Sequence, residues 1–378
     1  MIYLDNGATT FPKPREVYTA VARAFHRCGG NPGRGSHEAA RLAADCIYDA
    51  RLAASELFSC DVENVVLTYN ATHALNLAIK GLATKGTHVL ISDIEHNSVR
   101  RPVAALEKTH GITFGVFQTF GGDRERLLAS LENVLTDNTS MVVSVHTSNI
   151  CGITLPVSDI AKLCRRRGIT YIVDASQSAG HLPIDFSALG ADAVCMAGHK
   201  GLYGPAGTGL LLLRDGIEPE TVIEGGSGID SLEVGMPALL PERLEAGTLS
   251  AQLAAGLAAG IRWVSRVGVN GIRAHEGELS RILAEELTEM RGVTLYGYYP
   301  ERDTSTVLFD LNCVSPTSLA AQLDTYGICV RAGLHCAPLA HRTLGTPEDG
   351  AVRVSFGYFN KREHVKKLVD CLRRVRKS

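Results

Sequence analysis

The chain has 378 residues, of which 45% are hydrophobic and 21% are charged, the composition of an ordinary soluble globular protein with room for two cores or one large core. Its formal net charge of −2 gives no electrostatic reason for nucleic acid or an anionic membrane to be the main partner. No apolar run approaches the ~20 residues of a membrane span, and the N-terminus lacks the basic start and apolar stretch of a signal peptide. We therefore expect a cytoplasmic protein.

Strand and helix patterns alternate through the first two thirds of the chain. The predicted strands are 64–68, 88–92, 112–117, 140–145, 169–173, 193–196 and 209–213. The predicted helices are 15–27, 39–57, 72–82, 124–135 and 157–167. This alternation predicts an α/β fold whose sheet is mostly parallel and covered by helices on both faces.

The last third changes character. Helical patterns at 253–267, 270–290, 318–326 and 361–374 surround strand-like runs at 306–311, 328–331 and 352–355. This α+β layout predicts a second, smaller domain, and the Gly- and Pro-rich stretch 225–247 is the only boundary signal. We expect a large domain over 15–252 and a small C-terminal domain over 253–378, joined by the N-terminal segment 1–14.

Asp174 and Lys200 form the most informative pair in the sequence. Asp174 ends an apolar run, and Lys200 follows 26 residues later in a glycine-rich turn. Pyridoxal 5'-phosphate chemistry needs such a pair, because the lysine binds the cofactor covalently and the acid pairs with the pyridine nitrogen. A lysine in such a turn is usually just solvated, so the signal is its combination with Asp174. His199 is a candidate for lowering the pKa of Lys200.

Three further positions follow predicted strands. A phosphate could bind the free N–H groups of the helix start at Ala71 and Thr72, although Thr72 as a plain N-cap is the simpler alternative. His96 and Asn149 follow two other strands, at the sheet edge where such folds bind ligands. An imidazole there can stack on a planar cofactor, and an amide can donate to a ring oxygen or a carboxylate. Taken singly each is as readily structural, but packing hardly explains the whole set.

Arg331 and Arg353 lie on predicted short strands of the small domain. Surface arginine is the alternative, but the apolar neighbours of Arg353 would make an isolated charge costly. Since arginine binds carboxylates with two parallel hydrogen bonds, we favour a clamp for a substrate α-carboxylate.

Cys336 stands apart among ten cysteines that show no paired spacing. Gly333 and Pro338 bound it in what we expect to be an exposed loop, and the neighbouring His335 could lower its pKa. A zinc site formed by His335, Cys336 and His341 is an alternative, but it lacks the usual ligand spacing, and we expect no metal.

These motifs resemble those of the class V aminotransferase family and, within it, the cysteine desulfurases. The resemblance extends from Tyr3–Thr10 to Arg353–Asn360 and is most specific at 95–97, 174–177 and 198–200, together with 331–336. The short cysteine loop resembles the group with a structured loop, which includes selenocysteine lyases. The resemblance implies fold type I of the pyridoxal-phosphate-dependent transferases.

The resemblance also implies individual roles at the cofactor ring. Lys200 is the Schiff-base lysine, and Asp174 pairs with the pyridine nitrogen. Gln177 bonds the ring hydroxyl oxygen, and His96 stacks on the ring.

Other implied roles concern the phosphate and the sulfur. Thr72 and His199 hold the phosphate, and Thr248 reaches the phosphate of the other subunit's cofactor, which implies a homodimer. Cys336 accepts sulfur.

The implied reaction converts L-cysteine to L-alanine and leaves a persulfide on Cys336. A sulfur-acceptor protein then collects the sulfur, as in iron–sulfur cluster assembly. The alternatives are a selenocysteine lyase, another class V aminotransferase, or a cofactor-binding regulator without catalysis. A true aminotransferase has no need of Cys336, and no DNA-binding segment is visible. The sequence departs from its relatives at Ala197, where serine is common, and at Leu334, where a second histidine is common.

Overall fold

The computed structural model describes residues 1–33, 35–299 and 304–376. Its largest element is a seven-stranded sheet with the order β2-β8-β7-β6-β5-β3-β4. The strands are β2 (Val65–Thr68), β3 (His88–Ser92), β4 (Thr113–Phe117), β5 (Thr139–Val145), β6 (Thr170–Asp174), β7 (Ala193–Ala197) and β8 (Gly209–Leu213). Only β8 runs antiparallel to its two neighbours, β2 and β7, so the carboxyl ends of the other six strands meet at one edge.

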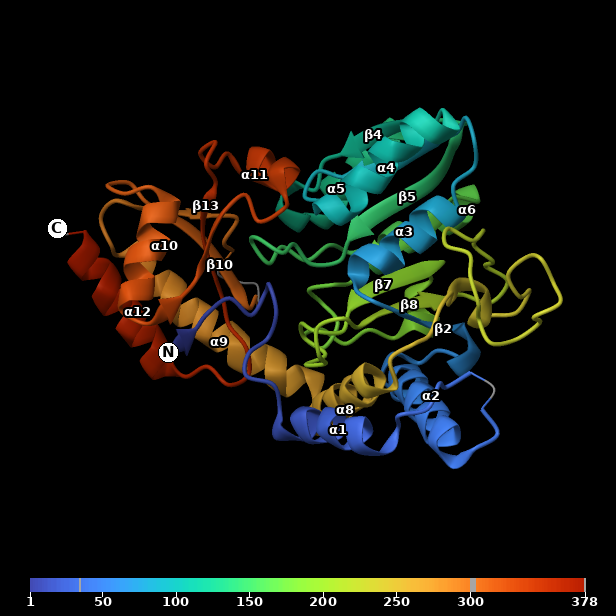
Figure 1. Ribbon diagram of the computed structural model, residues 1–378. Coiled ribbons are helices and arrows are strands. Elements are labelled where there is room, and N and C mark those ends of the chain that lie inside the picture. The colour runs from blue at the N-terminus through green and yellow to red at the C-terminus, as the bar shows by residue number, and fades with distance from the viewer. Residues whose placement is uncertain (34, 300–303, 377–378) are drawn as a thin grey trace.

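Helices bury both faces of this sheet (Figure 1). Residues on β5 show why, because Val142 packs into the core on one face and Val143 into the core on the other. One face is covered by α3 (Ala71–Gly81) and α4 (Asn97–His110). The other is covered by α5 (Arg124–Val134), α6 (Val157–Arg167), α2 (Glu38–Phe58) and α8 (Ala251–Val267).

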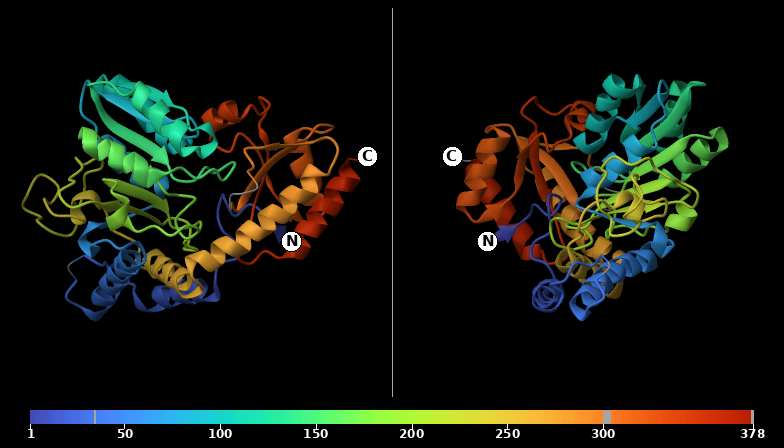
Figure 2. Two further views of the ribbon diagram at one scale, coloured as in Figure 1. Left: turned by 180° about the vertical axis from the view of Figure 1, so that it is seen from behind. Right: turned by 45° about the vertical axis from the view of Figure 1, so that its right-hand side comes forward.

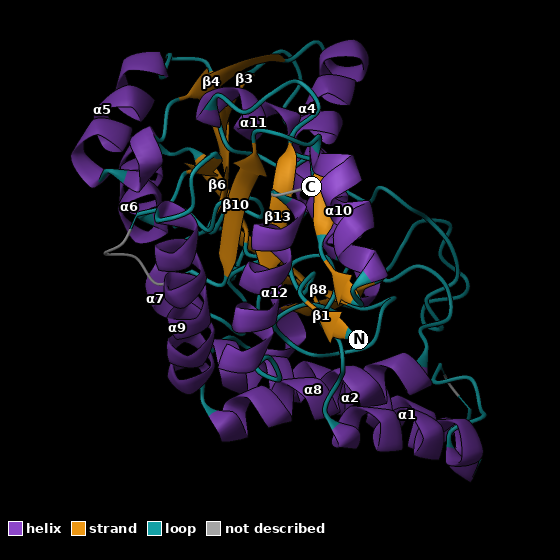
Figure 3. Ribbon diagram, turned by 90° about the vertical axis from the view of Figure 1, so that its left-hand side faces the viewer, coloured by secondary structure: helices purple, strands orange, loops and turns teal. Residues whose placement is uncertain are grey.

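A second core forms around a four-stranded antiparallel sheet with the order β12-β13-β10-β9. Its strands are β9 (Val293–Tyr296), β10 (Thr306–Leu311), β12 (Arg331–Gly333) and β13 (Ala351–Ser355). Figure 3 shows α9 (Val269–Thr288), α10 (Pro316–Thr325) and α12 (Arg362–Val375) in front of this sheet. The remaining helices are α1 (Arg15–Arg27), which packs on α8, the short α7 (Phe186–Leu189) and α11 (Pro338–Leu344).

The N-terminal segment connects the two parts. β1 (Ile2–Tyr3) pairs in parallel with β11 (Ile328–Cys329), and Leu4 is buried in the second core. The chain then passes between the small sheet and the large one before entering α1 (Figure 2). The N-terminal residues are therefore placed close to the edge of the large sheet.

The structure confirms the predicted α/β class, with a mostly parallel sheet and a smaller antiparallel C-terminal sheet. Two details differ. The single strand expected at 328–331 is two strands, because Ile328–Cys329 pair with β1 whereas Arg331–Gly333 pair with β13. The sequence analysis also lacks α4, which contains Pro102. Its buried residues Val99, Val103 and Leu106 have helical spacing, and their packing outweighs the hydrogen bond that proline removes.

No helix among residues 1–33, 35–299 and 304–376 is both long enough and apolar enough to cross a membrane.

Candidate active site

Four predicted site residues follow four adjacent strands of the large sheet. Lys200 comes three residues after β7, and Asp174 is the last residue of β6. Asn149 and His96 come four residues after β5 and β3. Because β7, β6, β5 and β3 are neighbours and run in parallel, all four residues reach the same edge of the sheet.

Lys200 is set for nucleophilic chemistry. Burial lowers the pKa of its amine to about 8, although the nearby Asp174 carboxylate acts in the opposite direction. The cations that contribute to this lowering are Arg353 and Arg331. His199, the neighbour named as a candidate in the sequence analysis, is not among the causes; burial lowers the pKa of its own ring to about 4, so the ring is neutral at neutral pH.

Asp174 is buried, and its carboxylate is oriented by the next turn of the chain. The Ser176 N–H donates to Oδ1 of Asp174 at 2.9 Å, and the Ser176 hydroxyl donates to the same oxygen. These two bonds leave the other carboxylate oxygen available to a ring nitrogen.

His96 is the N-cap of α4. The Ser98 N–H donates to Nδ1 of the His96 ring at 3.0 Å, and the Ser98 hydroxyl lies 2.7 Å from the same nitrogen. Burial lowers the pKa of His96 to about 4, so the ring is neutral and carries its proton on Nε2. A flat, neutral imidazole therefore lies at the sheet edge.

The turn that carries Lys200 is fixed by the N-terminal segment. The carbonyl oxygen of His199 accepts hydrogen bonds from the N–H of Thr10 (3.1 Å), the hydroxyls of Thr9 (3.1 Å) and Thr10 (3.2 Å), and Nζ of Lys13 (2.7 Å). The side chain of His199, in contrast to its carbonyl group, lacks one partner. Its Nδ1 is buried and has no hydrogen-bond partner in the described part of the chain. An unpaired buried nitrogen of this kind fits a missing polar group.

The start of α3 rules out the alternative that Thr72 is a plain N-cap. Its N-cap is Asn70, whose side chain accepts from the His73 N–H at 2.9 Å, so Thr72 is not the cap. Ala71 begins the helix and Thr72 is exposed in its first turn, where backbone N–H groups have no partner within the helix.

Arg353 has a partner that the sequence analysis did not provide. Its Nη2 forms an ion pair with Asp5 at 2.6 Å, and its Nη1 donates to the carbonyl oxygen of Asn149 at 2.8 Å. The buried charge is therefore not isolated, contrary to the argument from its apolar neighbours. Its Nε is buried without a hydrogen-bond partner among the described residues, and Arg331 is aligned with it on the adjacent strand.

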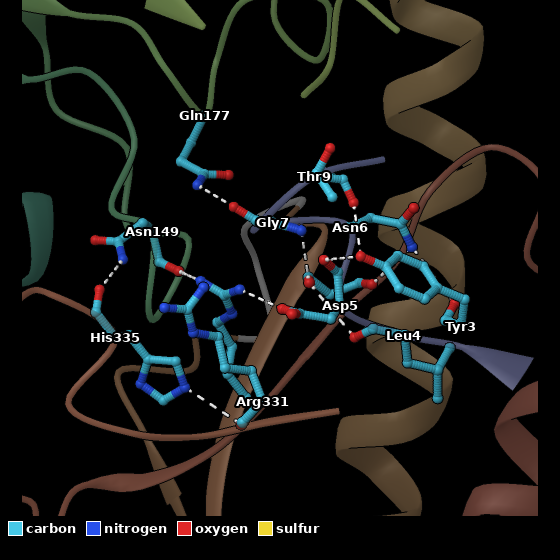
Figure 4. Close-up of polar contacts among 12 residues, drawn as sticks. Tyr3, Leu4, Asp5, Asn6, Gly7, Thr9, Asn149, Gln177, Arg331 and His335 are labelled. Atoms are coloured by element: carbon cyan, nitrogen blue, oxygen red, sulfur yellow. Dashed lines mark hydrogen bonds and ion pairs between the residues drawn. The ribbon is translucent and has the colours of Figure 1, made fainter. Parts of the chain in front are cut away.

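The N-terminal segment contributes groups to the site that the sequence analysis missed. Besides Asp5, the carbonyl oxygen of Gly7 accepts from Nε2 of Gln177 at 2.8 Å (Figure 4). The only available signal was the motif Tyr3–Thr10, which carried part of the resemblance but suggested no role for these residues.

Thr248 lies elsewhere on the chain. It is exposed and lines a cavity of about 550 Å³ together with Asn31, Gly228, and the buried ion pair of Arg51 with Glu245. None of the four strand-end residues lines this cavity, so Thr248 does not join them within one chain.

Cys336 is exposed, as predicted, in a loop held from both sides. Its carbonyl oxygen accepts from the Asn97 N–H at 2.8 Å, and the carbonyl oxygen of His335 accepts from Nδ2 of Asn149 at 3.0 Å. Two residues of the large sheet's edge thus fix the backbone of the cysteine loop.

His335 does not act as the cationic neighbour that we expected for Cys336. Burial lowers the pKa of the His335 ring to about 3, and its two nitrogens face His341 and the carbonyl oxygen of Arg331. The zinc alternative gains no support either, since no group of three metal-ligating side chains occurs within the described residues.

The residues at this edge fit pyridoxal phosphate. They offer an amine of lowered pKa, a buried carboxylate, and unpaired buried nitrogens on His199 and Arg353. Such a set supplies a covalent anchor, a partner for a ring nitrogen, and donors for anionic groups.

Comparisons with known proteins agree with this assessment. The aminotransferase class-V family matches residues 2–368. A probable cysteine desulfurase of Methanothermobacter thermautotrophicus is 32% identical over 384 residues, covering 99% of this chain and 94% of its own. Another, from Pyrococcus abyssi, is 31% identical and covers 100% of this chain and 95% of its own.

Solved structures give the same result. The apo structure of a cysteine desulfurase from Thermococcus onnurineus superposes with a TM-score of 0.91 at 30% identity, over 100% of this chain and 94% of that one. The cysteine desulfurase CsdA of Escherichia coli, at 24% identity, shares the fold with a TM-score of 0.89 over 99% of this chain and 94% of its own.

The chain therefore belongs to the aminotransferase class-V family, whose members depend on pyridoxal phosphate. The two relatives named above are probable cysteine desulfurases, and the structure from Thermococcus onnurineus is that of a cysteine desulfurase.

Proposed function

We propose that the protein is a pyridoxal-phosphate-dependent cysteine desulfurase that converts L-cysteine to L-alanine and takes the sulfur onto Cys336. The observation that carries the proposal is the exposed Cys336, whose backbone is bonded to Asn97 beside the strand-end residues. A transferase that moves only an amino group has no use for a thiol fixed at this place.

The cofactor, held covalently by Lys200, supplies an electron sink for the substrate α-carbon. Asp174 pairs with its ring nitrogen, and His96 stacks on the ring. Gln177 keeps one amide hydrogen free beside its bond to Gly7 and donates it to the ring oxygen.

The phosphate group has its own set of ligands. The free N–H groups of Ala71 and Thr72 and the Thr72 hydroxyl bind it at the start of α3. Nδ1 of His199 is directed to it, and Thr248 of a second subunit completes the site. Ala197 contributes no hydroxyl at the position where relatives often have serine.

Arg353 and Arg331 bind the carboxylate of cysteine, and Asn149 orients it. Lys200 holds the proton removed from the α-carbon, as its pKa of about 8 allows near neutral pH. Lys200 acts as this base once the substrate amine has displaced it from the cofactor. The Cys336 thiolate attacks the substrate sulfur, and the carbon–sulfur bond breaks with its electron pair going to the β-carbon. The β-carbon takes up the proton of the substrate thiol and the α-carbon regains the proton held by Lys200, which gives alanine and a persulfide on Cys336. A sulfur-acceptor protein then removes the persulfide sulfur, as in iron–sulfur cluster assembly.

The function is tested by incubating the purified, cofactor-loaded protein with L-cysteine and a thiol reductant. We expect alanine and sulfide in equal amounts. Selenocysteine, assayed in parallel, distinguishes the alternative of a selenocysteine lyase, which would release alanine from that substrate only. No alanine from either substrate contradicts both activities.

Replacement of Arg353 tests the carboxylate clamp. Arg353→Ala removes a buried charge-assisted pair, which costs on the order of 2–5 kcal/mol of binding, so we expect KM for cysteine to rise at least ~30-fold. Arg331→Ala, on the more exposed strand, should raise KM less. The absorbance of the bound cofactor should be unchanged in both variants. An unchanged KM in Arg353→Ala would show that Arg353 does not bind the substrate carboxylate.

A shared active site predicts a homodimer. Thr248 lies far from Lys200 in sequence and outside its site, and the preceding segment exposes Leu232 almost fully, Val234 fully and Leu239 by 74%. Such apolar side chains on a loop are typical of a covered surface. Light scattering should give twice the 40.5 kDa chain mass.

The matched variants for this prediction are Thr248→Ala and the pair Leu232→Asp with Val234→Asp. We expect Thr248→Ala to remain dimeric and bind the cofactor more weakly, whereas the aspartate pair should weaken the dimer. A wild-type monomer that turns over cysteine would rule the shared site out.

A further inference from the structure

A chain of hydrogen bonds runs behind Cys336 through two buried histidines. Nδ1 of the His335 ring lies 3.2 Å from Nε2 of His341, and Nδ1 of His341 lies 2.8 Å from the Thr346 hydroxyl. At the other end, Nε2 of His335 lies 3.3 Å from the carbonyl oxygen of Arg331. The two rings are nearly parallel, at 9°, and the histidines are only 5% and 2% exposed.

The chain has one direction that satisfies every group. A carbonyl oxygen only accepts, so His335 must carry its proton on Nε2 and donate to Arg331. Burial lowers the pKa of His335 to about 3 and of His341 to about 4, so each ring carries a single proton at neutral pH. Nδ1 of His335 is then an acceptor, and His341 must donate to it through Nε2.

The same reasoning gives the direction of the hydrogen bond between Thr346 and His341. With its proton on Nε2, His341 accepts at Nδ1, and the donor is the Thr346 hydroxyl. The 2.8 Å contact is shorter than those of this hydroxyl with the carbonyl oxygens of His341 (3.4 Å) and Pro347 (3.3 Å). Thr346, His341 and His335 thus form a directed chain that ends on the backbone of Arg331.

The cysteine loop needs such support because its backbone is strained. His335 has φ +51° and Cys336 has φ +56°, in the left-handed region that side chains with a Cβ rarely adopt. Residues stay in such conformations only where their surroundings fix them. Asn97 holds the carbonyl group of Cys336, and Asn149 holds that of His335. The hydrogen-bond chain from Thr346 through His341 holds the side chain of His335.

We propose that His341, acting with Thr346, is a positioning residue for the sulfur-transfer step: through His335 it holds Cys336 in a fixed relation to the strand that carries Arg331. This inference rests on the proposed function, since it concerns the thiol that we assign as the sulfur acceptor. His341 bears on the reaction only through His335.

The test compares three variants. His341→Phe keeps a ring but removes both polar contacts, and Thr346→Val removes only the hydroxyl. His341→Gln restores a donor toward His335. We expect kcat for alanine release from cysteine to fall about tenfold in His341→Phe and about threefold in Thr346→Val, as lost buried hydrogen bonds of this kind predict. His341→Gln should recover most of the rate.

Two sets of measurements separate a positioning role of His341 from general damage to the protein. The first set is kinetic and spectroscopic. KM for cysteine and cofactor absorbance should stay unchanged, and selenocysteine turnover should change less than about twofold, because selenium leaves without a thiol acceptor. His26→Phe, on the exposed end of α1, is the matched control and should behave as the wild type.

The second measurement, the chemical reactivity of the Cys336 thiol, does not depend on catalysis. The rate of iodoacetamide alkylation at Cys336, referred to the other exposed cysteine, Cys313, in the same molecule, should change in His341→Phe and Thr346→Val and be restored in His341→Gln. Equal alkylation ratios and equal kcat in Thr346→Val and the wild type would overturn the inference, even if His341→Phe does not fold. A wild type that forms no alanine from cysteine refutes the proposed function instead, while the alkylation ratios still decide the role of His341.

Discussion

Cys336→Ser should bind pyridoxal phosphate and L-cysteine normally and then fail to release alanine. A hydroxyl does not accept the substrate sulfur as a thiolate does, so we expect kcat to fall on the order of 10³-fold or more. Absorbance spectra of the bound cofactor before and after addition of cysteine should match those of the wild type. Mass spectrometry of the wild type after brief exposure to cysteine should show one added sulfur on the peptide that contains Cys336.

Cys313→Ser is the matched control for this prediction. Cys313 and Cys336 are the two exposed cysteines, but Cys313 lies in the turn after β10, a strand of the small antiparallel sheet. Its replacement should leave turnover and persulfide formation intact. Full cysteine turnover by Cys336→Ser, or sulfur on Cys313, would refute the proposed mechanism. Retained turnover of selenocysteine by Cys336→Ser is compatible with it.

The sequence predicts the residues at the sheet edge well, because the pattern that marks each of them lies in the few residues directly before it. The runs before Lys200 and Asp174 are continuous and apolar, which is typical of strands buried on both faces. Parallel strands bring their carboxyl ends to one edge, so residues that follow such runs gather without knowledge of the strand order. The structure adds that β7, β6, β5 and β3 are direct neighbours.

Other parts of the site depend on contacts between distant segments, and no sequence pattern predicts them. Asp5 pairs with Arg353 from 348 positions away, and Asn149 bonds His335 from 186 positions away. The role expected for His335 was wrong because adjacency in sequence says nothing about where a ring points. Its nitrogens are occupied by His341 and by the backbone of Arg331.

Lys200 should carry the cofactor covalently. After borohydride reduction and proteolysis, a pyridoxyl group should be found on the peptide that contains Lys200. Lys13 is the instructive comparison, because burial lowers its pKa to about 8 as well, yet its Nζ bonds Thr10 and the carbonyl oxygen of His199. A label on Lys13 would contradict the assignment, and the label should remain on Lys200 in Lys13→Ala.

Lys200→Ala should abolish covalent attachment and lower kcat by roughly 10²–10⁴-fold or more, since it also removes the general base. The pH dependence of attachment gives a sharper test in the wild type. The neutral amine is the nucleophile, and a pKa lowered to about 8 leaves about half of it neutral at pH 8, against roughly 0.3% for an amine of pKa 10.5. The rate at which apo-protein acquires the cofactor absorbance band should therefore rise with pH and level off above a midpoint near 8. A rate that keeps rising toward pH 10 would mean that Lys200 has the pKa of a solvated lysine, and that burial does not prepare it for this chemistry.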